Sequence, residues 1–353
     1  MREGENDALA LTVRCLISNY TRRMYISSCH DDVVKMNKAH KLIVCWALLF
    51  FTVSSTLCAQ ASKSPNGMYE YDTFMIPFVT ESLKCVLSVV FELFTTTVES
   101  KRTQFGVCRF LQFSLPAACY FATNNCMFYI IKELGGATFQ VTNSLKILST
   151  GLLMRMCLGR KLRWCQWKAL IILTIGCAVT QLKMCTEDNL GDQSRSKRSV
   201  GYAMVLLNAF ASGAGGVVSE KLLKGSQGTM ETIHRQNAQL YFFGAVFGLI
   251  AIQRNKYSKT SVDDNMDVSH EAMSMFSGFN AFAFATIFSL TASGLLVSFV
   301  LKYMDNVVKC FVVAGGMMLV ALFNICIGDE HQPLQLFFGM TLNCLALEQY
   351  YFS

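Results

Sequence analysis

Four ionisable side chains stand inside long apolar runs, where a charge is costly and therefore informative. Glu81 and Lys84 share one run, Lys146 lies in a second and Glu348 in a third. In lipid such residues usually face a charged partner or a water-filled cavity. Glu81 and Lys84 are three residues apart, so a helix would place them on one face at pairing distance. The pair either fixes helix packing or lines a polar cavity.

Lys146 ends an unusually polar stretch for a membrane segment, Gln-Val-Thr-Asn-Ser-Leu-Lys over residues 140–146. Steps of three and four residues gather the polar side chains on one helix face. The lysine either extends its ammonium to the membrane surface or faces a cavity. In a cavity it would bind an anion, and phosphate is the obvious candidate.

The composition of the chain indicates that these apolar runs lie in a lipid bilayer. The chain has 353 residues, of which 52% are hydrophobic and 16% charged, with a mean hydropathy of +0.36. Soluble domains are about 25% charged, and a membrane helix needs about 20 mostly apolar residues. We therefore expect an all-α polytopic membrane protein. The expected spans are 42–59, 73–94, 111–131, 137–157, 166–184, 201–219, 237–253, 275–300, 310–327 and 333–352.

Several other classes of function are excluded. The 15 cysteines form no Cys-x-x-Cys pair and none of the five histidines stands at ligand spacing to them, so no metal, disulfide or cofactor chemistry is expected. The net charge of +7 is scattered through loops, which argues against a nucleic-acid partner. The sequence contains no P-loop, zinc-protease, hydrolase or dinucleotide-binding signature, so we expect no enzyme.

Small residues cluster in two of the expected spans. Gly244 and Gly248 form a Gly-x-x-x-Gly pair, which favours close helix packing. The run Ser212–Gly216 either packs against a helix or lets the flat face of a ligand approach the backbone.

An ordered set of segments between residues 73 and 327 resembles the nucleotide-sugar transporter family, in the branch that carries CMP-sialic acid, UDP-galactose and UDP-N-acetylglucosamine. The sharpest is Lys-Tyr-x-Asp-Asn-Val-Val-Lys at residues 302–309. The others are Glu81-x-x-Lys84, Ser114-Leu115-Pro116, Asn124-Asn125, residues 137–142 with 145–147, Arg160-Lys161-Leu162, Gln166-Trp167, residues 212–217 with Glu220-Lys221, and Asn237-x-Gln239.

The resemblance implies a ten-helix fold of two inverted five-helix repeats with the site between them. The boundaries would be a cytosolic N-terminal segment at 1–37, a first repeat at 38–184, a lumenal loop at 185–200 and a second repeat at 201–353. Residues 1–37 carry no span and do not read as a cleavable signal peptide. Loops on the side of the N-terminus carry twice as many Lys and Arg residues as the opposite loops, which favours both termini in the cytosol.

The same resemblance implies roles for individual residues. Lys146 and Lys302 would neutralise phosphate charge, amides and Tyr241 would contact base and ribose, and glycines would admit the base. The implied substrate-binding set is Asn124, Asn125, Phe139, Thr142, Lys146, Ser212, Gly213, Gly216, Asn237, Tyr241 and Lys302. Structural or coupling roles fall to Glu81, Lys84, Asp305, Asn306 and Lys309.

Four positions depart from the family pattern. Phe139 stands where relatives carry Tyr, Phe243 where they carry a small polar residue, and Cys310 where they carry Gly. Arg235 and Asn237 are separated by Gln236 where the family has an adjacent pair. These changes bear on the choice of nucleobase.

The function implied is a Golgi antiporter that exchanges a cytosolic UDP-sugar, UDP-galactose or UDP-N-acetylglucosamine, for a nucleoside monophosphate. A CMP-sialic acid-type transporter and a transport-inactive membrane scaffold remain open as alternatives. The implied partners are the nucleotides and the lipid bilayer, and the resemblance is compatible with a homodimer or with association with glycosyltransferases.

Overall fold

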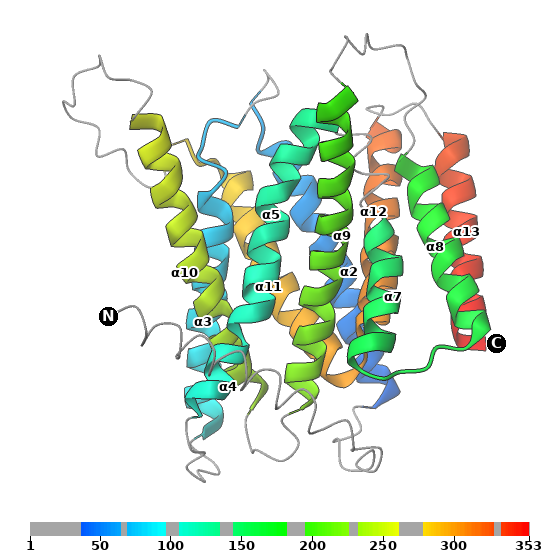
Figure 1. The fold of residues 1–353 in the computed structure, drawn as a ribbon, viewed down its shortest axis with the longest axis horizontal. Helices are drawn as coiled ribbons and strands as arrows, with labels where there is room; N and C mark the ends of the chain where they lie inside the picture. The colour runs from blue at the N-terminus through cyan, green and yellow to red at the C-terminus, as the bar shows by residue number, and fades with distance from the viewer. Residues whose placement is uncertain are drawn as a thin grey trace.

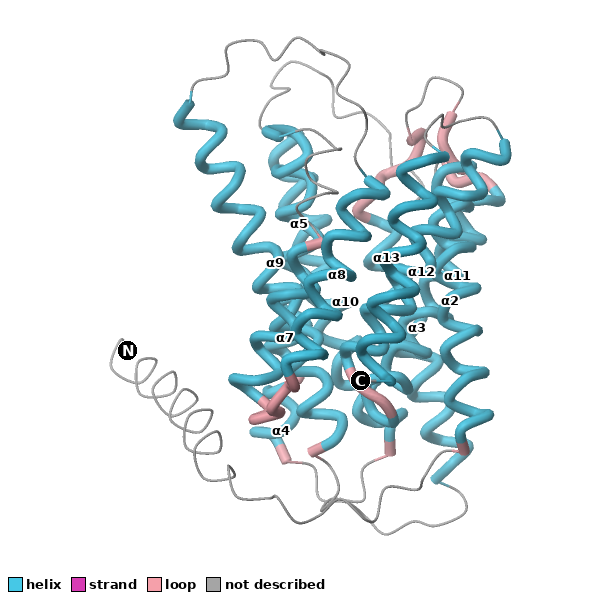
Figure 2. The backbone as a smooth tube through the Cα atoms, turned by 90° about the vertical axis from the view of Figure 1, so that its right-hand side faces the viewer, coloured by secondary structure: helices cyan, strands magenta, loops and turns pink. Residues whose placement is uncertain are grey.

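The computed structural model describes residues 37–64, 69–96, 106–134, 144–181, 195–225, 232–260, 278–327 and 333–352, which form helices and contain no strand. The long helices run side by side along one direction (Figures 1 and 2). In chain order they are α2 Lys38–Ala61, α3 Met75–Thr96, the short α4 Val107–Gln112, α5 Ser114–Leu134, α7 Leu145–Cys157, α8 Trp164–Gln181, α9 Arg195–Lys224, α10 Ile233–Thr260, α11 Ala281–Tyr303, α12 Asn306–Ile327 and α13 Pro333–Phe352.

The described helices suit a membrane. Four of them are long and apolar enough to cross a bilayer: α2, the Val200–Lys224 part of α9, α11 and α12. Large apolar side chains such as Trp46, Phe50 and Phe288 are more than half exposed, which a lipid environment accepts and water does not. Each expected span overlaps a described helix, although residues 137–143 of the fourth lie outside the described part of the chain.

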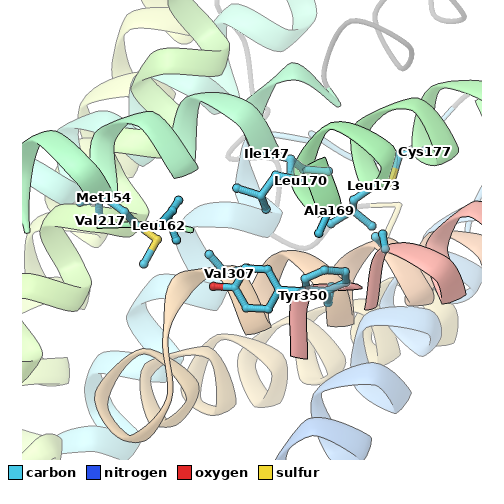
Figure 3. Close-up of a cluster of buried hydrophobic side chains, with 13 residues drawn as sticks. Ile147, Met154, Leu162, Ala169, Leu170, Leu173, Cys177, Val217, Val307 and Tyr350 are labelled. Carbon is cyan, nitrogen blue, oxygen red and sulfur yellow. The ribbon is translucent and has the colours of Figure 1, made fainter. Parts of the chain in front are cut away.

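The two halves of the chain are packed into each other. The most extensive helix pairings are α8 with α13, α3 with α10, α2 with α11, and α9 with both α5 and α7. Each of these joins a helix before residue 182 to one after residue 194. A buried cluster that includes Met154, Leu170, Val217, Phe311 and Tyr350 joins α7 and α8 to α9, α12 and α13 (Figure 3).

Glycines let paired helices approach closely, as is common in membranes. Where α8 meets α13, a Cβ added to Gly339 would lie 2.1 Å from the Thr180 methyl carbon and 2.9 Å from the carbonyl oxygen of Gly176. Backbone and side chain of α8 therefore occupy the space that a larger residue would need.

We expect Gly339→Ala to lower the stability of the protein by about 1–3 kcal/mol, because overpacking forces backbone shifts. Gly315→Ala is the matched control, since its Cβ would meet only the Leu49 side chain at 3.6 Å. There the better helix propensity of alanine should leave stability unchanged or raise it by up to about 1 kcal/mol. Thermal melting of the detergent-solubilised protein measures both, and equal effects of the two changes would contradict the packing role of Gly339.

Candidate functional site

A cavity of about 320 Å³ lies between helices from both halves of the chain. Its walls come from α3, α5, α9, α10, α11 and α12, and combine apolar side chains with a few polar ones. The polar or charged side chains that line it are Thr73, Glu81, Lys84, Tyr120, Ser219, Tyr241, Ser298 and Lys309.

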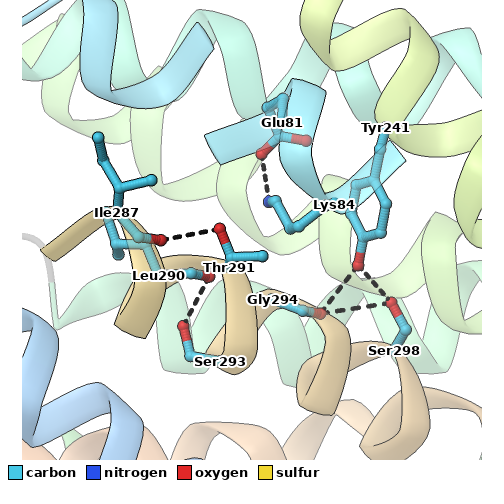
Figure 4. A network of polar contacts seen from close by, with 9 residues as sticks. All are labelled: Glu81, Lys84, Tyr241, Ile287, Leu290, Thr291, Ser293, Gly294 and Ser298. Atoms are coloured by element: carbon cyan, nitrogen blue, oxygen red, sulfur yellow. Dashed lines mark hydrogen bonds and ion pairs between the residues drawn. The ribbon is translucent and has the colours of Figure 1, made fainter. Parts of the chain in front are cut away.

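One wall of the cavity is an ion pair held by a network of polar contacts (Figure 4). Lys84 pairs with Glu81 on α3, as their spacing predicts. The Lys84 ammonium lies 4.6 Å from the ring centroid of Tyr241, which adds a cation–π attraction. The Tyr241 hydroxyl in turn donates to the carbonyl oxygen of Gly294 at 2.9 Å and lies 2.8 Å from the Ser298 hydroxyl. The network ties α3, α10 and α11 together.

Two glycines make room for this ion pair. A Cβ on Gly244 of α10 would lie 2.7 Å from a carboxylate oxygen of Glu81, and one on Gly294 of α11 would lie 2.7 Å from Cδ of Lys84. Gly248, the other half of the Gly-x-x-x-Gly pair, packs on Phe78 of α3 at 3.3 Å. The packing interpretation of Gly244 and Gly248 is therefore confirmed.

Lys309 brings a second positive charge to the cavity. Its ammonium lies 5.7 Å from the ring centroid of Tyr120, and Lys146 on α7 lies within electrostatic range of it. Among the residues that the structure describes, no carboxylate pairs with either lysine. Glu81, a conceivable partner for Lys146, is taken by Lys84. Lys309 thus brings to the cavity a positive charge without a described carboxylate partner, whereas Lys146 does not line the cavity and interacts with Lys309 only electrostatically.

The direction of Lys309 is set by the break between α11 and α12. At the start of α12 the amide of Val308 donates to the Asp305 side chain at 2.9 Å, and the amide of Asn306 donates to the buried carboxylate of Glu220 at 2.9 Å. Both carboxylates satisfy amides that a helix leaves unpaired at its beginning. Arg160 pairs with Asp305 at 2.9 Å. Asp305 and Glu220 thus hold the helix break, and Asn306 is held there through its backbone amide.

Lys302 lies on the other side of this break. Its ammonium donates to the Gln236 side chain at 3.4 Å, and it is not one of the described residues that line the cavity. The structure thus brings Lys309 to the cavity, where the resemblance implied Lys302. Sequence spacing alone does not distinguish the two lysines, because the break between them changes the face that each one occupies.

Several buried polar atoms near the cavity have no hydrogen-bond partner within the described part of the chain. They include the Ser219 hydroxyl, which lines the cavity, and both side-chain amide atoms of Asn237, one turn before Tyr241 on α10. Burying such atoms unpaired is costly. Of these, Ser219 lines the cavity, whereas Asn237 is fully buried behind it.

The small residues of α9 are occupied by protein in this conformation. A Cβ on Gly213 would lie 2.9 Å from the Ser149 hydroxyl, and one on Gly216 would lie 2.4 Å from the Asn306 amide nitrogen. Ser212 is half-buried beside them. Both glycines therefore let α7 and α12 approach α9, and their contact with a base stays a prediction.

The remaining expected site residues are placed less fully. Asn124 and Asn125 lie on α5, whereas Phe139 and Thr142 fall outside the described residues. Glu348 is exposed near the end of α13 and is not part of the cavity. Sequence reasoning missed Tyr120, because an aromatic residue in an apolar helix gives no signal that distinguishes a cavity wall from a packed core.

Comparison of the sequence with known proteins identifies its family. The sequence pattern of the nucleotide-sugar transporter family matches residues 35–351. The chain belongs to this family. Members are transporters rather than enzymes, and the chain is a multi-pass membrane protein.

Individual relatives carry two different substrate names. "CMP-sialic acid transporter 1" of Oryza sativa subsp. indica is 30% identical over 306 residues, covering 86% of this chain and 92% of the relative. "UDP-N-acetylglucosamine transporter" of Rattus norvegicus is 31% identical over 304 residues, covering 82% and 88%. A solved crystal structure with 12% sequence identity superposes with a TM-score of 0.63 over 90% of this chain and 98% of its own. That likeness concerns the fold alone.

The ion pair generates a testable prediction. Lys84→Met should leave the Glu81 carboxylate without its partner in a mostly buried site, and removing one partner of such a pair costs on the order of 3 kcal/mol. The double variant Glu81→Gln/Lys84→Met should recover a large part of the loss, because no charge is then stranded. Melting temperatures of the two single variants and the double variant complete the cycle, and strictly additive losses would show that the two residues are not coupled.

Proposed function

We propose that this transporter carries a pyrimidine nucleotide-sugar across the Golgi membrane by alternating access, in exchange for the nucleoside monophosphate. A UDP-sugar, UDP-galactose or UDP-N-acetylglucosamine, is the proposed cargo. The proposed architecture is ten spans in two inverted five-helix repeats, residues 38–184 and 201–353, with both termini in the cytosol. Family membership and the cavity between the two halves of the chain support this proposal.

The observation that carries it is the unpaired charge of Lys309 and Lys146. Within the described residues these ammonium groups interact electrostatically and neither pairs with a carboxylate, and Lys309 lines the cavity. Their repulsion and their removal from water both cost free energy. A nucleotide phosphate relieves both costs at once, and charge-assisted hydrogen bonds to phosphate are among the stronger polar contacts. The ligand thus completes a site that is electrostatically incomplete without it.

The rest of the nucleotide has polar partners in the same region. Ser219 and Asn237 offer unsatisfied donors and acceptors for base and ribose. The Tyr241 hydroxyl is already engaged with Gly294 and Ser298, so in this conformation Tyr241 contributes its ring and positions Lys84. The cavity is small for a complete nucleotide-sugar, and alternating access supplies the larger opening during transport.

The substrate is tested by thermal stabilisation of the purified protein with UMP, CMP, GMP and AMP, because a ligand that binds the folded state raises its stability. The largest shift should come with UMP, and proteoliposomes loaded with UMP should take up labelled UDP-sugar. A larger shift with CMP and uptake of CMP-sialic acid would favour that alternative. Absence of both nucleotide response and uptake would support the membrane scaffold instead.

The two lysines of the 302–309 motif give a matched comparison. Lys309→Gln should weaken the binding of UMP by at least tenfold, since a hydrogen bond to a charged group is worth about 1.5–3 kcal/mol. Lys302→Gln should weaken it less, because Lys302 contacts Gln236 rather than the cavity. Titrations of the melting temperature with UMP measure both, and a selective loss in Lys302→Gln would reverse the assignment.

Replacing Lys146 should affect stability differently from replacing Lys84. Lys146→Met removes a charge that has no carboxylate partner among the described residues, so no acid is stranded. The melting temperature of the empty protein should stay the same or rise, while the response to UMP should be lost. A lower melting temperature with an intact response to UMP would contradict the phosphate-binding role of Lys146.

A further inference from the structure

A second cavity, of about 820 Å³, lies at the end of the bundle where α2 begins and α13 ends. It lies beside the break between α11 and α12, with Met304 and Asp305 in its wall. The two cavities have no lining residue in common. The nucleotide site therefore does not account for it.

Two of the four basic residues that line this cavity are already paired. Arg160 binds Asp305 at 2.9 Å, and Lys224 binds Glu220 at 2.7 Å and also donates to the carbonyl oxygen of Met304. Asp305 and Glu220 are the two acidic residues of the described lining, and both also hold the first turn of α12. No carboxylate in the lining is left for another cation.

The other two basic residues, Lys38 and Lys41, have no carboxylate partner in the part of the chain that the structure describes. Lys38 is exposed and Lys41 half-buried. They are three residues apart in the first turns of α2, so they share a helix face and repel each other. An anion between them would relieve this repulsion. The cavity thus has an excess of positive charge at its open edge.

The same edge continues into a lipid-facing surface. Leu42 lines the cavity and is 59% exposed. Trp46 and Phe50 follow at steps of four residues and are 62% and 65% exposed. Leu42, Trp46 and Phe50 therefore form one apolar stripe that leads along α2 from Lys38 and Lys41 into the membrane. Tryptophan and lysine at a helix end are typical of the membrane interface.

We propose that this cavity binds the headgroup of an anionic phospholipid. Lys38 and Lys41 contact its phosphate, and an acyl chain lies along the stripe Leu42–Trp46–Phe50. Basic pockets between membrane helices are suited to lipid headgroups in this way. A free phosphate matches the two lysines but leaves the stripe without a role, which is why the geometry favours a lipid.

The test uses the full-length protein in detergent and follows its melting temperature. Dioctanoyl phosphatidic acid should raise it with saturation. Dioctanoyl phosphatidylcholine, inorganic phosphate and glycerol 3-phosphate should have little effect at the same concentrations. Lys38→Gln/Lys41→Gln should raise the half-saturating concentration of phosphatidic acid at least tenfold.

A matched control separates this site from general surface charge. Lys161 and Lys168 are exposed at the same end of the bundle and do not line the cavity, so Lys161→Gln/Lys168→Gln makes the same change in net charge and should leave the half-saturating concentration unchanged. Lys38→Arg/Lys41→Arg keeps the charge and should keep phosphatidic acid binding. If the glutamine variant does not fold, the arginine variant is the one to measure, and loss of binding in it would contradict the proposal. The proposal would be overturned by an equal loss of phosphatidic acid affinity in the Lys161/Lys168 control or by equal stabilisation with inorganic phosphate. It would also be overturned if the Lys38→Gln/Lys41→Gln variant bound phosphatidic acid as well as the unchanged protein does.

Discussion

The first turn of α12 depends on two carboxylates, and the geometry of the site depends on that turn. Asp305 caps the helix from within the motif, and Glu220 reaches it from α9. Both are anchored by cations, Arg160 and Lys224. Because these contacts fix where α11 ends and α12 begins, Lys302 turns to Gln236 while Lys309 turns to the cavity. One helix break therefore decides which of the two lysines lines the cavity.

The protein treats the charges within its helix bundle in two different ways. Glu81 and Lys84 neutralise each other, and glycines on α10 and α11 supply the space that their side chains need. Removing one partner of such a pair is expensive, because the other charge is then left unpaired in a mostly buried site. Lys146 and Lys309 have no such compensation among the described residues. The paired charges therefore help hold α3, α10 and α11 together, whereas no described carboxylate neutralises Lys146 or Lys309.

The sequence predicted much of this arrangement because lipid makes its requirements visible in composition. Long apolar runs located the helices, and the three-residue spacing of Glu81 and Lys84 predicted their contact. The sequence was less informative where contacts between residues distant in the chain determine the structure. The register of the break at residues 304–305 depends on Glu220 and Arg160, which are distant in sequence. Likewise, no local pattern shows that Tyr120 lines a cavity rather than a packed core.

The glycines show most clearly what the sequence alone does not predict. The pattern Gly244-x-x-x-Gly248 and the cluster at 212–216 both predict that a backbone is closely approached, yet neither says by what. In the structure the approaching group is a carboxylate at Gly244, a serine hydroxyl at Gly213 and an asparagine amide at Gly216. The contacts at Gly213 and Gly216 join helices from different parts of the chain, so any movement that separates α9 from α7 or α12 exposes bare backbone. Small residues at these positions thus allow the close packing of α9 on α7 and α12.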